Sequence, residues 1–328
     1  MDVTDTHSDA PWRRTFPAVA TASDVYHCFR LILGRNPNHE EWEGHAANVG
    51  RDLTEVVANY VNSLEFDRRG LRAPPRSGRP LIAERDGWRM YADPADDAVG
   101  RHVLFGEYEP AVAAQFHEVV KPGMNVVDIG ANIGFFTLLA AHLTGPSGQV
   151  FAVEPNPANV RLIEASRLLN RFVHVTVWQA AAADRTGLKV LNTFHSNGTT
   201  ADPSGDPDRL WDATTVACLR LDDVLPGDPV HLVKADVEGA EYTALRGCER
   251  MLRRWRPVIV SEFSPGQLPG ISGVTGPDYL SWLIALGYRL AILHEAGPPQ
   301  EAGIDVGLVM AAFANRGADH IDIVARPG

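Results

Sequence analysis

The sequence predicts an α/β protein, with a main domain built on a mostly parallel sheet that carries helices on both faces, preceded by a small all-α domain. Two observations support this prediction. From residue 81 onward, near-continuous apolar runs of strand length alternate with stretches of helical periodicity, the pattern of a parallel sheet covered on both sides. Before residue 69, apolar residues recur at helical spacing in short stretches. Gly34 and Pro37 interrupt the helical pattern between two of these stretches.

Length and composition limit the class of protein. The 328 residues suit two domains, and 45% hydrophobic with 22% charged residues is ordinary for a globular protein. The net charge of −11 argues against nucleic acid and against an anionic membrane surface as partners. No apolar run approaches the ~18 residues of a membrane span, the N-terminus lacks a secretory signal, and the three cysteines are scattered, so we expect a cytoplasmic protein. Association into homo-oligomers stays open.

Changes in composition divide the chain into four segments. Residues 1–20 are polar and aperiodic, which predicts a frayed tail. Residues 21–68 form the expected small helical domain, and residues 69–80, rich in arginine and proline, form a linker. Residues 81–328 form the α/β domain, interrupted near 188–222 by a hairpin-like insertion. Part of that insertion is rich in Gly, Pro and Asp, and we expect it to cover the substrate.

The expected elements follow from the periodicity in chain order. The helical domain holds three helical patterns, over residues 25–33, 39–49 and 53–64. In the α/β domain, the candidate strands are Asn125–Ile129, Gln149–Val153, 174–180, 231–236, Val258–Phe263, 288–293 and 307–314. Helices are expected over 135–143, Pro157–Asn170 and 279–286.

The first chemistry-bearing motif follows the strand Asn125–Ile129. Asp128 is followed by Gly130, Asn132 and Gly134, and a helix begins directly afterwards. In open α/β sheets, ligands bind beyond the carboxyl ends of the strands, and a glycine there lets a ligand approach the backbone closely. The spacing is G-x-x-x-G rather than the G-x-G-x-x-G of a pyrophosphate cradle, and a carboxylate disfavours an anion, so we expect a cationic or zwitterionic ligand.

The next two strands end in groups that complete such a site. Glu154 and Asn156 follow the second strand, and a carboxylate there can accept hydrogen bonds from both hydroxyls of a ribose. The third strand ends in small residues, Ala181 among them, which leave room for a flat base. Each feature alone has an ordinary structural explanation, such as a helix-capping acid, but together they favour a nucleoside-bearing ligand.

A second acidic motif, VKADVEGAE, follows the fourth candidate strand. Side chains alternate along a strand, so Lys234 and Asp236 point the same way, and Asp236 reaches the same edge as Asp128. Glu238 comes next along the chain, and the fifth strand adds Glu262. Two such acids can act as base and orienting group, with Lys234 fixing an ionised partner, or they can chelate a hard cation such as Mg²⁺.

The runs VVDIGANIGFFTLLAA, FAVEPNP and VKADVEGAE resemble the FkbM family of S-adenosylmethionine-dependent methyltransferases, as does the segment from Met90 to Pro110. The resemblance covers about 88–293. It implies the class I methyltransferase sheet of seven strands with one antiparallel. It also implies O-methylation of a hydroxyl on a polyketide, sugar or other natural-product intermediate. Separately, YHCFRLILGRNPNHEEW and YVNSLEFDRR are similar to a small bacterial helical domain of unknown function.

Under this resemblance, the residues take specific roles. S-adenosylmethionine is held by Asp128 at its ammonium group and by Glu154 at its ribose, and the remaining cofactor residues are Gly130, Asn132, Gly134, Asn156, Ala181 and Asp236. Asp236, Glu262 and Lys234 are the catalytic candidates, with His195 of the insertion as an alternative base. A divalent cation on Asp236, Glu238 and Glu262 is a second way to lower the pKa of the acceptor hydroxyl.

Two other function classes compete with a methyltransferase. A nucleotide-cofactor oxidoreductase would use the same sheet, but the glycine spacing and Asp128 disfavour it. A non-catalytic binding or scaffold protein would use the helical domain as its working part. Binding of S-adenosylmethionine, compared with NAD, separates these possibilities.

Overall fold

The computed structural model describes residues 18–63, 65–66, 80–106, 108–194, 196–202, 210, 213–295 and 297–328. The chain divides into two compact units, residues 1–77 and 78–328. The predicted tail up to residue 17, most of the predicted linker and the candidate base His195 lie outside the described residues. None of the helices in the described part is both long and apolar enough to cross a membrane.

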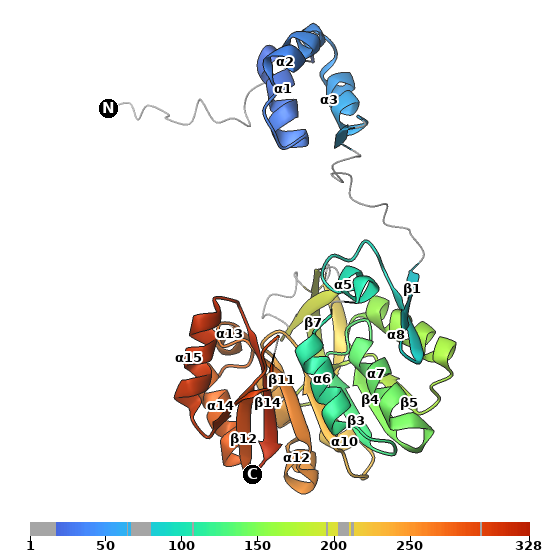
Figure 1. The fold of residues 1–328 in the computed structure, drawn as a ribbon, viewed down its shortest axis with the longest axis vertical. Coiled ribbons are helices and arrows are strands. Elements are labelled where there is room, and N and C mark those ends of the chain that lie inside the picture. The colour runs from blue at the N-terminus through green and yellow to red at the C-terminus, as the bar shows by residue number, and fades with distance from the viewer. Residues whose placement is uncertain are drawn as a thin grey trace. The chain divides into compact units, whose positions relative to one another are not determined.

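The first unit is a small helical bundle (Figure 1). Its elements are α1 (Ala22–His27), the π-helical turn η2 (Cys28–Ile32), α2 (His39–His45), the short turn η3 (Ala46–Asn48) and α3 (Leu53–Val61). Thr21, Asn38 and Asp52 cap the three α-helices, each by accepting a hydrogen bond from a backbone N–H of the first turn. The core is formed by Val25, Phe29, Val56 and Tyr60 with their neighbours.

The second unit is built on a sheet with eight described strands in the order β13-β12-β14-β11-β10-β3-β4-β5. Their bounds are β3 Asn125–Ile129, β4 Gln149–Val153, β5 Val175–Trp178, β10 Leu232–Ala235, β11 Val258–Phe263, β12 Tyr288–Ile292, β13 Gln300–Gly303 and β14 Ile321–Pro327. Strands β11, β10, β3, β4 and β5 pair in parallel, and β14 runs antiparallel between β11 and β12. This confirms the class I methyltransferase-like sheet, and the edge strand β13 is an addition to the seven strands that were predicted.

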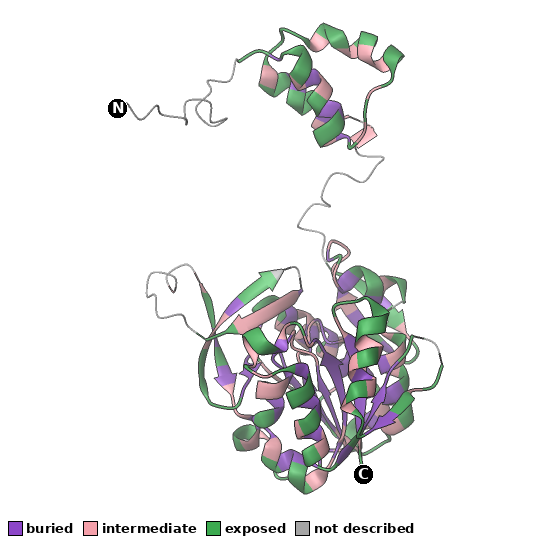
Figure 2. Cartoon of the chain, turned by 90° about the vertical axis from the view of Figure 1, so that its left-hand side faces the viewer, coloured by how far each residue is buried: buried purple, intermediate pink, exposed green. Residues whose placement is uncertain are grey.

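Helices cover both faces of the sheet. Side chains alternate along each strand, so each strand contributes apolar residues to a core on either face. On one face, Val126, Val150 and Leu232 pack with helices α6 (Pro110–Val119) and α7 (Phe135–Thr144). On the other face, Val127, Val233 and Ile259 pack with the helices that follow β10 and β11. Figure 2 shows the result as purple strands enclosed by helices whose outer sides are green. The remaining helices are α5 (Gly100–Phe105), α8 (Pro157–Asn170), α10 (Leu221–Val224), α11 (Glu241–Arg246), α12 (Glu249–Trp255), α13 (Leu268–Ile271), α14 (Gly276–Ala285) and α15 (Val306–Arg316), with the turn η4 (Gly145–Ser147).

The C-terminal part corrects one prediction. Residues 307–314, predicted as a strand, lie within α15, and the final strand is β14. A short continuous apolar run does not distinguish a buried strand from a helix. Asp305 decides the outcome locally, because its side chain accepts a hydrogen bond from the Leu308 N–H and caps the helix.

Two smaller sheets flank the main one. β1 (Leu81–Arg85) and β2 (Trp88–Ala92) form an antiparallel hairpin that the sequence prediction missed. The insertion forms β7 (Gly187–Phe194), β8 (Asn197–Ala201) and β9 (Thr214–Leu219), which join β6 (Ala181–Ala182) in the order β6-β9-β7-β8. The third predicted strand, over 174–180, is shorter than expected because the chain leaves the main sheet after Trp178 and enters this second sheet.

Candidate active site

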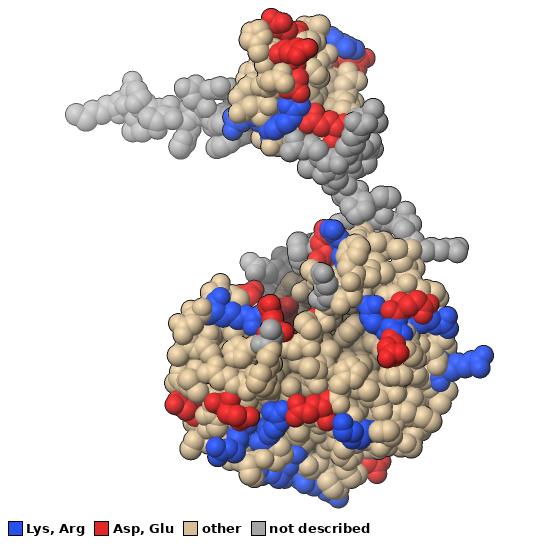
Figure 3. All heavy atoms as spheres, viewed as in Figure 1, with Lys and Arg blue, Asp and Glu red and all other residues tan. Residues whose placement is uncertain are grey.

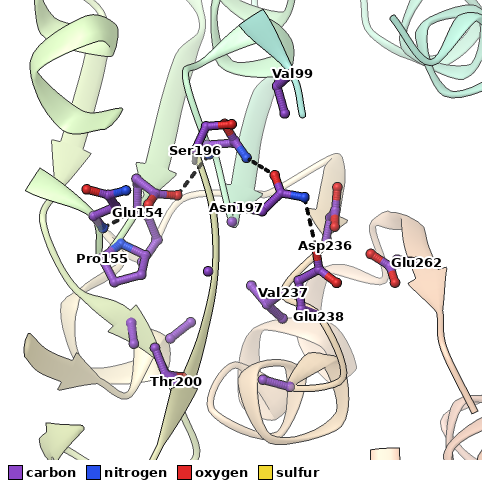
Figure 4. A pocket seen from close by; sticks show the side chains of 18 of the residues that line it. Val99, Glu154, Pro155, Ser196, Asn197, Thr200, Asp236, Val237, Glu238 and Glu262 are labelled. Carbon is purple, nitrogen blue, oxygen red and sulfur yellow. Dashed lines mark hydrogen bonds between the residues drawn. The ribbon is translucent and has the colours of Figure 1, made fainter. Parts of the chain in front are cut away.

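A cavity of about 310 Å³ lies at the carboxyl ends of the parallel strands. This is the edge at which open α/β sheets bind ligands, and the volume is within the ~300–1,000 Å³ of typical small-molecule sites. Figure 4 shows Glu154 on one side, Asp236, Glu238 and Glu262 on the other, and Asn197 of the insertion between them. The lining also includes Ala98, Val99, Tyr108, Glu109, Gly130, Asn132, Val153, Pro155, Asn156, Ala180–Ala182, Leu191, Ser196, Gly198, Thr200, Val237, Ala240, His320 and Asp322.

The two glycines of the first motif serve backbone packing. Gly130 has a φ of +78°, and a Cβ there would lie 1.8 Å from the Asp236 carbonyl oxygen. The ends of β3 and β10 therefore come together only around a glycine. Gly134 has a φ of +96°, and a Cβ there would meet Ile163 of α8 at 2.9 Å. Gly130 lines the cavity as predicted, whereas Gly134 is not among its lining residues and serves helix packing.

Glu154 is held in place by three donors at the tip of β4. Its Oε2 accepts a hydrogen bond from the Asn132 N–H at 2.8 Å, and its Oε1 accepts from the Asn156 N–H at 2.8 Å and from Asn159 Nδ2 at 3.3 Å. Burial raises the pKa of Glu154 to about 7, although these hydrogen bonds favour the ionised form and oppose the rise. A carboxylate has about four acceptor positions, so roughly one remains for a ligand. Glu154 thus faces the cavity, but its capacity to accept both hydroxyls of a ribose is limited.

Asn132 and Asn156 order this side of the cavity. Asn132 has a φ of +50°, a left-handed conformation that asparagine tolerates better than most residues, and its Nδ2 donates to Asn197 Oδ1 at 2.9 Å. Asn156 caps α8, since its side chain accepts from the Ala158 N–H at 2.9 Å. Ala181, at the start of the second sheet, lines the cavity with Ala180 and Ala182, so the small-residue wall expected there is present.

Asp128 differs from its predicted position. Its side chain is fully buried, and its Oδ2 accepts a hydrogen bond from Thr137 Oγ1 of α7 at 2.6 Å. Its Oδ1 has no hydrogen-bond partner among the described residues, and Asp128 is absent from the described lining of the cavity. Burial raises its pKa, although Lys234 and Thr137 oppose this effect. The side chain links β3 to α7 behind the cavity wall, which does not match the predicted direct contact with a ligand ammonium group.

Lys234 and Asp236 form the central ion pair. Lys234 Nζ lies 2.7 Å from Asp236 Oδ2, and it also lies 4.9 Å from the centre of the Phe136 ring. Burial alone would lower the pKa of Lys234, but the carboxylates around it raise it above its ordinary value. Burial alone would raise the pKa of Asp236, but Lys234 and a hydrogen bond from Glu262 lower it. Asp236 is therefore an ionised carboxylate that is held in position.

Glu262 shares a side-chain hydrogen bond with Asp236. Burial and the Asp236 charge raise its pKa well above the ordinary value, and Ser264 Oγ donates to its Oε1. Glu238, in the β10–α11 loop, has a φ of +53° and accepts from Asn197 Nδ2 at 3.2 Å. The described residues contain no group of three His, Cys, Asp or Glu side chains arranged to hold a metal ion, and the cation set Asp236, Glu238 and Glu262 stays a prediction.

Several cavity residues were not found from the sequence. Tyr108 and Glu109 precede α6, Ser196 and Asn197 come from the insertion, and His320 and Asp322 lie at the start of β14. Asp322 is the cross-strand partner of Glu262 in the β14–β11 pairing. Because the strand β14 was not predicted, the position of Asp322 beside Glu262 could not be predicted either. Burial raises the pKa of Glu109 to about 7, against the attraction of Lys234.

Part of this chain is similar to a known methyltransferase. Among curated proteins, the 31-O-demethyl-FK506 methyltransferase FkbM of Streptomyces tacrolimicus is 39% identical over 80 residues, which cover 24% of this chain and 30% of that protein. This chain thus aligns with less than a third of that relative's length.

Solved structures of methyltransferases are similar at lower identity. The methyltransferase FkbM from Methylobacillus flagellatus KT is 18% identical, with a TM-score of 0.39, over 69% of this chain and 52% of that one. The precorrin-6y C5,15-methyltransferase from Geobacter metallireducens GS-15 is 16% identical, with a TM-score of 0.40, over 73% and 94% of the two chains.

The family assignment depends on the segment that forms the cavity. A family model described as the methyltransferase FkbM domain matches residues 128–290. That segment contains Gly130, Glu154, the Lys234–Asp236 pair and Glu262, which the fold brings to one edge of the sheet. Residues 128–290 of this chain thus belong to the FkbM methyltransferase family.

Proposed function

We propose that the protein is an S-adenosylmethionine-dependent O-methyltransferase that acts on a hydroxyl of a small molecule, such as a polyketide, a sugar or another natural-product intermediate. The observation that carries the proposal is that one cavity joins the Glu154 side, which suits a nucleoside, to the ionised Asp236. A nucleoside-bearing cation and a hydroxyl acceptor can therefore meet within a single enclosed space.

The residues present fit the cofactor. Gly130 keeps the loop backbone close to the cavity, Ala180–Ala182 leave space for a flat base, and Glu154 keeps about one acceptor position. A cationic ligand also suits a lining in which the described residues include five carboxylates beside Glu154 and no lysine or arginine. We assign cofactor binding to Gly130, Asn132, Glu154, Asn156 and Ala181. S-adenosylmethionine, when bound, supplies a methyl group on a sulfonium, so that sulfur leaves as a neutral thioether.

Asp236 is the proposed base. Its carboxylate lines the cavity and is kept ionised by Lys234, so it can orient the acceptor hydroxyl and accept its proton. A free alcohol is far too weak an acid for a carboxylate. The proton becomes acidic only as the oxygen forms its new bond, and a base that is already in position can then remove it. Glu262 and Lys234 act by fixing the geometry of Asp236.

A divalent cation is the alternative means of activating the hydroxyl. Asp236, Glu238 and Glu262 all line the cavity and offer the oxygen ligands that Mg²⁺ prefers. The hydrogen bond between Asp236 and Glu262 would have to be broken for both to bind a cation. Metal dependence is tested by comparing turnover in chelator with turnover after adding Mg²⁺ back.

Calorimetry on the full chain tests the cofactor assignment. We expect S-adenosylmethionine and S-adenosylhomocysteine to bind, and NAD to give no heat. Gly130→Ala is expected to weaken binding at least tenfold, and Glu301→Gln, a substitution on the exposed edge strand β13, is expected to leave it unchanged. Binding of NAD without S-adenosylmethionine would support an oxidoreductase and contradict the proposal.

A further inference from the structure

Glu154 has fewer free acceptor positions than the ribose of the cofactor requires. Its two oxygens already accept three hydrogen bonds, from the backbone N–H groups of Asn132 and Asn156 and from the side chain of Asn159. A carboxylate has about four acceptor positions, so roughly one is left. A ribose carries two neighbouring hydroxyls, and each has one proton to donate. The second hydroxyl therefore needs a partner other than Glu154.

Ser196 has a hydroxyl that lacks a partner. The residue lies in the turn between β7 and β8 of the insertion, lines the cavity and is only 8% exposed. Its Oγ is buried and forms no hydrogen bond with any described residue. A buried hydroxyl without a partner costs free energy, and a ligand that supplies the partner removes that cost.

Two asparagines hold this turn beside Glu154. Asn159 Nδ2 donates both to Glu154 Oε1 at 3.3 Å and to the Ser196 carbonyl oxygen at 2.7 Å. Asn132 donates through its backbone N–H to Glu154 Oε2 at 2.8 Å and through its side chain to Asn197 Oδ1 at 2.9 Å. The turn of the insertion and the tip of β4 thus share two donor residues, and Figure 4 shows Ser196 on the Glu154 side of the cavity.

The Ser196 hydroxyl can reach a ligand without a change in the backbone. A serine side chain has one rotatable bond before Oγ, with three staggered positions, and Asn159 already holds the backbone of Ser196. The cavity can also be reached from solvent, since in Figure 3 acidic atoms lie at the hollow in the α/β unit. Ala180–Ala182 line the same cavity and leave space for the base that the ribose carries.

We propose that Ser196 and Glu154 together bind the two ribose hydroxyls of S-adenosylmethionine, with one hydroxyl donating to Glu154 and the other to Ser196 Oγ. This inference rests on the proposed function, because it adds a residue to the cofactor site of the same enzyme. It also gives the insertion a role besides the expected covering of the substrate, because the β7–β8 turn then forms part of the cofactor site.

Calorimetry of Ser196→Ala in the full chain tests the inference. The ligands are S-adenosylhomocysteine and its 2′-deoxy and 3′-deoxy forms, each of which lacks one ribose hydroxyl. In the unmodified chain, we expect each deoxy form to bind about fivefold more weakly than the parent ligand. Ser196→Ala should bind the parent ligand about fivefold more weakly than the unmodified chain does. It should bind one deoxy form as tightly as the parent ligand, because the hydroxyl that this form lacks has no partner left, and the other deoxy form should keep its loss.

Thermal unfolding separates a binding role of Ser196 from a structural one. Ser196→Ala removes a hydroxyl without a partner, so the unfolding temperature of the ligand-free protein should stay the same or rise. A lower unfolding temperature would assign the hydroxyl a structural role and overturn the inference. Thr215→Ala is the matched control, because it removes a hydroxyl from an exposed position of the same insertion, outside the described lining of the cavity, and should leave all three affinities unchanged.

Two results of the calorimetry would overturn the inference alone. Equal affinity of S-adenosylhomocysteine for Ser196→Ala and for the unmodified chain would mean that water, and not the cofactor, satisfies the hydroxyl. A weaker affinity with both deoxy losses retained would mean that Ser196 contacts another part of the ligand. In either case, binding of S-adenosylhomocysteine to the unmodified chain would still support the proposed function. Failure of the unmodified chain to bind it would contradict the proposed function itself.

Discussion

The two sides of the cavity are built from different interactions. On the β3–β4 side, Glu154 is fixed by two backbone N–H groups and one side-chain amide, and no described residue forms an ion pair with it. On the β10–β11–β14 side, Asp236 is fixed by Lys234 and Glu262, and Asp322 is the cross-strand neighbour of Glu262. The first side presents a shape set by the backbone, and the second presents charge. A nucleoside-bearing cofactor suits the first arrangement, and removal of a proton by an ionised carboxylate suits the second.

Removing the charge at Asp236 is expected to have the largest effect on this contrast. Asp236→Asn keeps the shape but cannot take a proton, so methyl transfer should fall by about 10²–10⁴. S-adenosylhomocysteine affinity should change by less than about threefold, because the cofactor side is held separately. The measurements are single-turnover transfer to the acceptor and calorimetry. Wild-type turnover in Asp236→Asn would assign the proton to another group, with His320 as the first described candidate.

Gly130→Ala is expected to have the second-largest effect, because it changes both sides of the cavity at once. The new methyl group would lie 1.8 Å from the Asp236 carbonyl oxygen, so either the β3 loop or the β10 loop must move. We expect a loss of stability of more than ~1 kcal/mol, together with a loss of cofactor binding of at least tenfold. Thermal unfolding and calorimetry measure the two effects.

Gly317→Ala is its control. Gly317 also has a positive φ, +66°, but nothing lies within 4 Å of a Cβ built there. This variant has the backbone strain of a non-glycine residue with a positive φ, but it lacks the steric clash of Gly130→Ala. Equal effects of the two substitutions would mean that the contact between the β3 and β10 loops is unimportant.

The two sides also differ in how much of them could be predicted from sequence. Gly130 and Glu154 directly follow β3 and β4, two strands predicted with correct bounds, so their place at the cavity could be predicted. Asp128 was misplaced because strand periodicity gives a face but not the neighbour on that face, here Thr137 of α7. Asp322 was missed because the apolar run 307–314 forms α15 and leaves β14 as the strand beside β11. Glu109 lies at the cavity and has a left-handed backbone conformation, which no local sequence pattern predicts.

The pH dependence of cofactor binding tests whether the ionised form of Glu154 binds the cofactor. Burial raises the pKa of Glu154 to about 7, so in the free protein about half of the molecules carry a neutral side chain near that pH. Ribose hydroxyls donate to the ionised form more strongly than to the neutral form. Cofactor affinity should therefore rise with pH, by about tenfold between roughly pH 6 and 8.

Calorimetry of Glu154→Gln over the same range isolates this group, since the variant cannot ionise and its affinity should lose that rise. Glu109 also has a pKa of about 7 but lies on the opposite side, so Glu109→Gln should keep it. A pH profile that survives in Glu154→Gln would show that another acid controls cofactor binding.

The smallest expected effect concerns Asn197, which connects the two sides. Its Oδ1 accepts from Asn132 at 2.9 Å, and its Nδ2 donates to Glu238 at 3.2 Å, so one insertion residue contacts both the cofactor loop and the acidic loop (Figure 4). Asn197→Ala should weaken cofactor binding and acceptor binding together, each by about threefold, because a partly exposed hydrogen bond contributes about 0.5–1.5 kcal/mol. Thr215→Ala, on the exposed side of β9, is the control and should change neither. If Asn197→Ala altered only one of the two affinities, the sides would be independent, and the insertion would serve one ligand rather than align both.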